Sequence, residues 1–170
     1  RSRQGVGSRQ HRGLKPETPA TMDGPSLRAR ALRHLARRDH SRTELAQKLA
    51  PHGTEAEVEA VLDRVAELGL LSDRRFAEAW VRSKAARFGA TRLRGELLRR
   101  GVDRELVDAA LETECLESEL DRARAVLRGR FAAPPADARE WARQARFLQT
   151  RGFAVDLIRK LLKERPDEPA

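Results

Sequence analysis

The sequence predicts an all-α protein, and three observations support this fold class. Apolar residues make up 39% of the 170 residues but aromatic residues only 4%, so Leu, Val and Ala must fill the core. No alternating run of β-branched residues is long enough to form a strand. Leucine and valine recur at helical spacing between glycines and capping residues. This pattern predicts about nine helices of ordinary length.

The predicted helices repeat along the chain, because three glycines mark the same point of a recurring pattern. A leucine stands four residues before Gly53, Gly101 and Gly152, and an apolar residue stands five and nine residues after each of them. This pattern is typical of a helix that ends at a glycine, followed by a helix that packs back on it. A further helix precedes each unit, at residues 26–38, 72–88 and about 116–130. The sequence therefore predicts three tandem three-helix repeats in an elongated molecule, in which each repeat mainly contacts its neighbours.

Capping residues and glycines set the limits of the elements. Ser41 and Thr54 each precede a glutamate at capping-box spacing, and Ser72 and Asp103 are candidate N-caps. We expect helices to end at Gly53, Gly69, Gly89, Gly101, Gly129 and Gly152. We expect residues 1–25 to form a disordered basic tail, because they contain almost no apolar side chains. The repeats are then placed at 26–71, 72–115 and 116–165, with disordered residues at 166–170.

The charge of the chain points to a polyanionic partner. The net charge is +9, and most of the 35 cations are arginine, which suits bidentate contacts with phosphate. A native start at Met22 would remove part of this excess but not its sign. The charge is also segregated, with basic residues at 26–42, 82–104 and 122–130 and acidic residues at 54–73 and 105–121. These blocks either line a continuous basic face or neutralise each other between adjacent helices.

The stretch LSDRRFAEAWVRSK, residues 71–84, allows two interpretations of its aromatic side chains. Phe76 and Trp80 lie among basic residues, as in a platform that stacks the bases of single-stranded nucleic acid. They also have the spacing of the buried stripe of an amphipathic helix, with arginines on the opposite side. We expect the rings to be buried. Lys84 and Arg87 fall on the side of the rings, so the end of this helix must leave the core, because a buried unpaired charge is costly.

The sequence contains no recognisable catalytic or metal-binding motif. It lacks a GxxxxGK[ST] phosphate loop, and its four histidines include no pair at positions i and i+4. Cys115 is the only cysteine, which excludes a disulfide within the chain and fits a reducing compartment. No apolar run approaches the roughly 20 residues of a membrane span, and no secretory signal is apparent. We expect a cytoplasmic binding protein that is not an enzyme and needs no metal or cofactor.

Several stretches resemble the RecX family of recombination regulators. ELGLLSDRRFAEAWVRSK, at 67–84, is similar to the family's hallmark pattern, whose places are occupied here by Gly69, Asp73, Phe76, Ala77, Trp80, Val81 and Lys84. RQARFLQTRGFAVDLIRKLL, at 143–162, is similar to the last module of the family, and TRLRGELLRRGVDRELVDAAL, at 91–111, to the middle module. With SRTELAQKL in the first module, the resemblance covers residues 26–165. The proline-rich linker at 132–138 and the N-terminal tail depart from the pattern.

The resemblance implies an elongated, curved molecule without enzymatic activity or cofactor. Members of the family bind the RecA recombinase filament on single-stranded DNA and lie in its helical groove. They restrain filament growth, ATP hydrolysis, strand exchange and LexA cleavage, which places them in DNA repair, DNA recombination and the SOS response. The implied partners are therefore the RecA recombinase filament and single-stranded DNA, with no membrane, and we expect the free protein to be a monomer.

The candidate binding residues follow from charge and spacing. We expect the arginine-rich faces of the second and third repeats to contact DNA phosphate or acidic filament surface, through Arg82, Lys84, Arg87, Arg92, Arg99, Arg143, Arg146 and Arg151. The acidic helices at 55–67 and 105–121 are expected to face basic surface elsewhere, or to keep the protein from collapsing onto DNA.

Two alternatives use DNA without a recombinase. SRTELAQKLAPHG followed by a helix resembles a helix-turn-helix, whose second helix enters the major groove. That second helix begins TEAEVEAVLDR, however, and its carboxylates would be repelled by phosphate. A general single-strand coating protein would need exposed aromatic side chains, which buried Phe76 and Trp80 do not supply.

Overall fold

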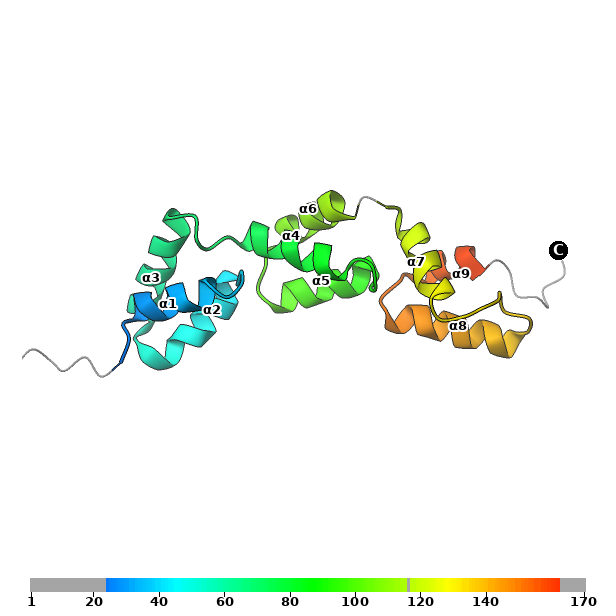
Figure 1. Ribbon diagram of the computed structural model, residues 1–170, viewed down its shortest axis with the longest axis horizontal. Coiled ribbons are helices and arrows are strands. Elements are labelled where there is room, and N and C mark those ends of the chain that lie inside the picture. Colours follow the sequence, from blue (N-terminus) through cyan, green and yellow to red (C-terminus); the bar gives the residue numbers. More distant parts are fainter. Residues whose placement is uncertain (1–23, 116, 163–170) are drawn as a thin grey trace, which may run out of the picture.

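The computed structural model describes residues 24–115 and 117–162. Within these residues the chain forms nine α-helices and one short 3-10 helix, without a strand. The helices form three consecutive bundles in a row, which makes the molecule elongated and gently curved (Figure 1). This arrangement confirms the predicted all-α fold of three tandem three-helix repeats. Residues 1–23 of the predicted tail, and the predicted disorder at 166–170, lie outside the described residues.

Module 1 consists of α1 (Leu27–Leu35), α2 (Arg42–Leu49), the 3-10 helix η1 (Ala50–His52) and α3 (Glu55–Glu67). Its helices bury an aliphatic core of Ala31, Leu45, Leu49, Val58, Leu62, Val65 and Leu71. The side chain of Ser41 accepts a hydrogen bond from the amide of Glu44, and Thr54 with Glu57 forms a complete capping box. These bonds satisfy amides that have no partner within the helix, so α2 and α3 begin where the caps stand.

Module 2 consists of α4 (Asp73–Lys84), α5 (Ala90–Arg99) and α6 (Arg104–Glu114). Ser72 and Asp103 cap α4 and α6, as predicted. The ring of Phe76 is 3% exposed in the core of the module, which confirms the interpretation of this aromatic as scaffold. Trp80 is only partly buried, and its ring lies 4.4 Å from the ammonium of Lys84.

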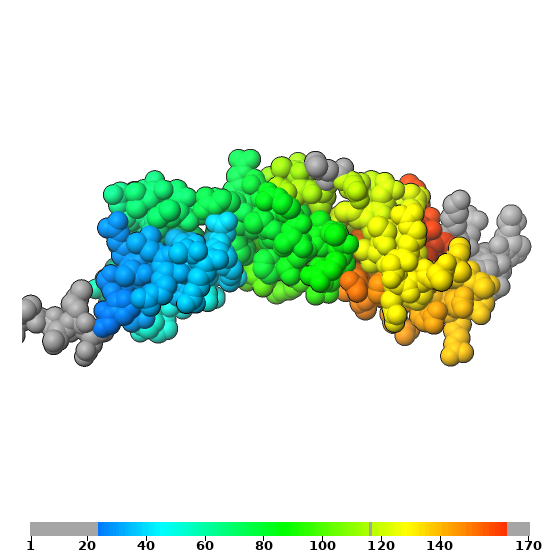
Figure 2. All heavy atoms as spheres, in the orientation of Figure 1, coloured from blue at the N-terminus to red at the C-terminus, as the bar shows by residue number. Residues whose placement is uncertain are grey.

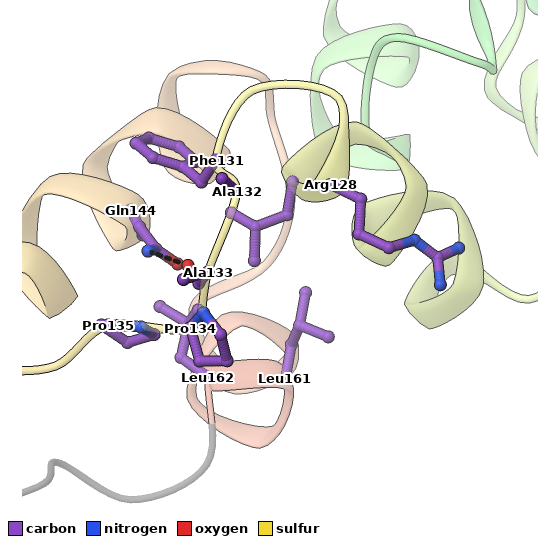
Figure 3. A pocket seen from close by; sticks show the side chains of 10 residues that line it. Arg128, Phe131, Ala132, Ala133, Pro134, Pro135, Gln144, Leu161 and Leu162 are labelled. Atoms are coloured by element: carbon purple, nitrogen blue, oxygen red, sulfur yellow. Dashed lines mark hydrogen bonds between the residues drawn. The ribbon is translucent and has the colours of Figure 1, made fainter.

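Module 3 consists of α7 (Glu119–Arg128), α8 (Ala138–Thr150) and α9 (Val155–Leu162). Its core contains Ala123, Leu148, Phe153, Ile158 and Leu162. A buried amide fixes the proline-rich linker that leads into α8: Gln144 is 2% exposed and donates through Nε2 to the carbonyl of Ala133, at 3.1 Å. The linker lines a mainly apolar pocket of about 460 Å³ beside α9 (Figure 3).

The glycines end helices at five of the six predicted places. Gly69, Gly101 and Gly152 have positive φ angles, and each stands just after a helix. The prediction was wrong for Gly89, which is the N-cap of α5, because α4 already ends at Lys84. The residues after α4 leave the helix where the carbonyls of Ala85 and Phe88 accept hydrogen bonds from a guanidinium of module 3. Gly53 is the C-cap of η1, which follows α2 directly, and Gly129 is the C-cap of α7, so helices end at both glycines as predicted.

Neighbouring modules are connected by corresponding hydrogen bonds at both joints. In joint 1, the amide of Arg42, the first residue of α2, donates to the carboxylate of Asp73 at 2.7 Å. In joint 2, the amide of Ala90, the first residue of α5, donates to the carboxylate of Glu119 at 2.8 Å. Each carboxylate belongs to the first residue of the next module's first helix. The first amides of α2 and α5 are therefore each bound by a carboxylate of the following module.

The second bond of each joint ends at the carbonyl that precedes a left-handed glycine. The hydroxyl of Ser41 donates to the carbonyl of Arg100 at 2.7 Å, next to Gly101. The amide of Gly89 donates to the carbonyl of Arg151 at 2.8 Å, next to Gly152. The modules consequently follow one another as a single row of touching bodies (Figure 2).

A pair of glycine variants tests whether joint 2 is as tightly packed as the structure indicates. At Gly69, with φ of 72°, a Cβ atom would meet nothing within 4 Å, so Gly69→Ala should cost only backbone strain, about 1 kcal/mol of unfolding free energy. At Gly152, with φ of 84°, a Cβ atom would also press on the backbone of Arg92. Gly152→Ala should therefore cost at least about 2 kcal/mol in urea unfolding. Equal losses of unfolding free energy in the two variants would show that the backbones at joint 2 move apart to accommodate the added Cβ atom.

Candidate nucleic-acid interface

Two of the eight predicted binding residues are held in ion pairs. Arg82 makes a bidentate contact with Glu114, with nitrogen–oxygen distances of 2.8 and 2.7 Å, and this guanidinium holds the pKa of the Glu114 carboxyl below its ordinary value. Arg92 pairs with Glu96 at 2.9 Å. For the other six, the described part of the chain places no carboxylate within ion-pair distance: Lys84, Arg87, Arg99, Arg143, Arg146 and Arg151.

The acidic block at 105–121 partly neutralises both of its basic neighbours. Besides Glu114, Asp108 pairs with Arg94 at 3.0 Å, and Asp121 pairs with Arg124 at 2.8 Å. Mutual neutralisation between adjacent helices, one of the two interpretations of the segregated charge, therefore holds for α6 with α4 and α5, whereas the pair of Asp121 lies within α7. Of the six predicted binding residues without an ion pair, five lie on module 3 or beside Phe88 at joint 2.

An arginine-lined groove runs along α8. Arg139, Arg143 and Arg146 lie on one face of the helix, because their positions are four and three residues apart. With Ala142, Phe147 and Thr150 they line a hollow of about 540 Å³ that contains no carboxylate among its lining residues. The guanidinium of Arg143 lies 5.3 Å from the ring of Phe131, so an aromatic contact supports it. We call this feature the α8 groove.

Four predicted residues converge on the ring of Phe88 at joint 2. The guanidinium of Arg92 lies 4.0 Å from the ring centroid, and the charged groups of Arg87, Arg151 and Lys84 lie at 5.5, 5.8 and 5.9 Å. Three of these side chains come from module 2, whereas Arg151 comes from the turn after α8 in module 3. The joint therefore gathers positive charge from both modules around one aromatic ring.

A second hollow lies directly at joint 2, between α4, α7 and α8. Arg87, Arg130 and Arg151 line it together with Phe147, and its volume is about 240 Å³. Phe147 also lines the α8 groove, so the two hollows adjoin. We call this second feature the joint-2 hollow. Arg99 lies apart from both, exposed at the end of α5.

Three arginines of this region were not among the predicted site residues. Arg139 shares the face of Arg143 and Arg146, and its helical spacing would have revealed it. Arg130 belongs to the basic block at 122–130, but only the fold shows that it reaches the joint-2 hollow. Arg122 is 6% exposed and donates to the carbonyls of Ala85 and Phe88 at 2.9 and 3.1 Å, which makes it a bridge between modules 2 and 3.

No group of three His, Cys, Asp or Glu side chains in 24–115 and 117–162 is arranged to hold a metal ion. No helix in the same ranges has the length and apolar character that crossing a bilayer requires.

Comparison with known proteins assigns all three modules to one family. The family models described as the first, second and third three-helix domains of RecX match residues 28–64, 72–111 and 117–162. A regulatory protein RecX from Leptothrix cholodnii is 51% identical over 81% of this chain and 88% of its own length. A regulatory protein RecX from Herbaspirillum seropedicae is 46% identical over 79% and 88%.

The fold is also shared with a solved structure. The crystal structure of RecX from Lactobacillus salivarius superposes with a TM-score of 0.69 at 20% identity, over 80% of this chain and 92% of that one. The matched modules, the named relatives and the common fold agree with the motifs in the sequence. The chain belongs to the RecX family of regulatory proteins.

Proposed function

We propose that the protein regulates the RecA recombinase by binding its filament on single-stranded DNA. In this role it inhibits filament growth, ATP hydrolysis, strand exchange and the cleavage of LexA. Membership of a family whose relatives are named as regulatory proteins supports a regulatory role. The observation that supports a filament as the target is the unpaired positive charge of the α8 groove and joint 2, which lies on a row of three modules.

The shape of the molecule suits a long, repetitive target. The three modules lie in a row (Figure 1), so a single chain can contact more than one subunit of a filament. A compact domain of equal size would reach fewer subunits. The row therefore favours a filament over an isolated globular partner.

The α8 groove supplies a surface for phosphate or for an acidic surface of the filament. Its arginines are exposed, and the described carboxylates do not neutralise Arg143 or Arg146. Guanidinium groups bind phosphate oxygens bidentately, and release of counterions makes such binding depend strongly on salt. Contacts between guanidinium groups and phosphate do not depend on the base sequence, so we assign the groove to contacts with the nucleic-acid backbone.

The acidic face of α3 argues against the helix-turn-helix alternative. Glu55, Glu59, Asp63 and Glu67 are exposed on this helix, which would have to enter the major groove. Arg42 pairs with Glu59 and Asp63, but it does not reverse the sign of the surface. We propose instead that α3 and α6 face basic surface on the filament, and that the free protein is a cytoplasmic monomer without catalytic activity.

The proposal predicts inhibition of a preformed filament. When the protein is titrated below equimolar amounts into RecA on single-stranded DNA, the rate of ATP hydrolysis should fall progressively, because each bound chain affects several subunits. Binding to bare single-stranded DNA at physiological salt should remain weak. An unchanged hydrolysis rate would contradict the proposal, and a selection for duplex sequences would then test the helix-turn-helix alternative.

The α8 groove can be tested by charge reversal. Arg143→Glu with Arg146→Glu should weaken filament binding about tenfold or more and lower the slope of the salt dependence by about one for each phosphate that the variant no longer binds. Both side chains are exposed, so the unfolding free energy should change by only about 0.5 kcal/mol. Arg159→Glu with Lys160→Glu, exposed on α9 outside the groove, is the control of equal charge. Equal weakening in both double variants would assign the effect to net charge rather than to the groove.

Arg92 and Arg99, both predicted to bind, should behave differently when reversed one at a time. Arg99→Glu should weaken filament binding and leave stability unchanged, since the side chain is exposed and unpaired among the described residues. Arg92→Glu should also cost about 1 kcal/mol of stability, because it removes the interactions with Phe88 and Glu96 and places two carboxylates together. Urea unfolding beside a filament-binding assay separates the two effects. A drop in the stability of Arg99→Glu would make that residue structural.

A further inference from the structure

We propose that the joint-2 hollow binds a phosphate group, and that this binding strengthens the contact between modules 2 and 3. The inference deepens the proposed function, on which it rests, by giving one part of the basic surface a conformational effect. The ligand class is a phosphate, either the phosphodiester of a nucleic acid or the free ion. The observations that carry it are a cavity, the three arginines that line it and the position of the cavity at a joint.

The hollow has the size and the lining for such a ligand. Its volume of about 240 Å³ is several times the roughly 30 Å³ that one water molecule occupies in the liquid, so a phosphate with part of its hydration fits. Arg87, Arg130 and Arg151 contribute three positive charges, while Ala, Val and Gly residues form the rest of the wall around Phe147. The described residues offer these arginines no carboxylate within ion-pair distance.

The guanidinium of Arg151 is held in place before any ligand arrives. It lies 4.9 Å from the ring of Phe147 and 5.8 Å from the ring of Phe88, between one aromatic side chain of each module. It also donates to the carbonyl of Arg87 at 3.4 Å. A planar guanidinium fixed between two rings loses little conformational freedom on binding an anion, so the contact is preorganised for phosphate.

The three cations come from both sides of the joint. Arg87 follows α4 in module 2, whereas Arg130 and Arg151 belong to module 3. Without an anion these like charges repel one another across the joint. A phosphate between them replaces this repulsion with charge-assisted hydrogen bonds that bridge the two modules.

The backbone of Arg151 connects the hollow to the joint itself. Its carbonyl accepts a hydrogen bond from the amide of Gly89 at 2.8 Å, and the adjoining amide of Ala90 donates to the carboxylate of Glu119. A ligand that holds Arg151 therefore also holds the acceptor of a joint hydrogen bond. Because coupling between binding and conformation is reciprocal, a phosphate that binds better to the closed joint must make opening of the joint rarer.

Hydrogen exchange of the joint amides measures this opening directly. The full chain is placed in a buffer without phosphate, and exchange of the Gly89 and Ala90 amides is followed by NMR with added inorganic phosphate or a short oligodeoxythymidylate. We expect exchange at both amides to slow by about fivefold or more. The amide of Arg42, which makes the equivalent bond in joint 1, should be unaffected and serves as the internal control.

A matched pair of variants locates the effect. Arg130→Ala removes one wall of the hollow and should abolish the slowing. Arg128→Ala removes a neighbouring exposed arginine that lines the separate pocket of Figure 3, and it should retain the slowing. Slowing by the oligonucleotide alone identifies the phosphodiester as the ligand, and slowing by both probes identifies any phosphate. Unchanged exchange with both probes, or slowing that persists in Arg130→Ala, overturns the inference.

The same proteins distinguish this inference from the proposed function. If the wild-type protein inhibits ATP hydrolysis by the filament while its joint amides exchange at the same rate with and without phosphate, the inference fails and the proposed function stands. If phosphate slows the joint amides but the protein leaves the filament unaffected, the proposed function fails and the phosphate site stands.

Discussion

The amide that begins each module's second helix is the group on which the arrangement of the modules depends. The first amides of a helix have no partner within it, and a buried amide without a partner is costly. Here the amides of Arg42 and Ala90 are satisfied by carboxylates of the following module, Asp73 and Glu119. The second helix of one module supplies the donor, and the first helix of the next module supplies the acceptor at its first residue. The same local requirement therefore fixes the relation between neighbouring modules at both joints. Repetition of one relation gives a curved row rather than a compact cluster (Figure 1).

The two joints share this contact but differ in charge, and the difference explains where the basic surface lies. Joint 1 uses a serine side chain as a spacer, and two ion pairs cross it, Arg75 with Asp39 and Arg100 with Glu44. Joint 2 has a glycine in place of the serine, so the backbones meet directly: a Cβ atom at Gly89 would strike the carbonyl of Gly152. This close approach brings Arg87 and Arg151, one from each module, to the ring of Phe88, and neither has a carboxylate of the described residues within ion-pair distance. The neutral joint and the positive joint are thus two versions of one contact.

Local patterns in the sequence predicted the helices, the caps and the repeat, because capping and amphipathic spacing act within a few residues. They also placed Phe76 in the core correctly. They did not predict which cations remain available, since the partner of Arg82 is Glu114, a residue on another helix of the same module. The position of Gly89 was misjudged for a related reason: the turn after α4 is stabilised by a guanidinium of the next module, and only the tertiary structure brings it there. Of the joint-2 hollow, the sequence indicated the charge but not the cavity.

The ends of the row show that the joint contact is specific to its two places. Serines cap the first helix of every module, at Ser26, Ser72 and Ser118, and the next residue supplies the joint carboxylate in modules 2 and 3. In module 1 that residue is Leu27, which has no carboxylate to offer. At the other end, α8 is capped from within its own module: the amide of Glu140 donates to the Asp137 carboxylate, and the amide of Ala136 donates to the Glu140 carboxylate. A second copy that approached α1 with the first amide of its α8 would find no carboxylate to accept it, because Leu27 stands at that position. The contact that connects the modules within the chain is therefore not available at α1, which suits the proposed binding of a filament by three modules.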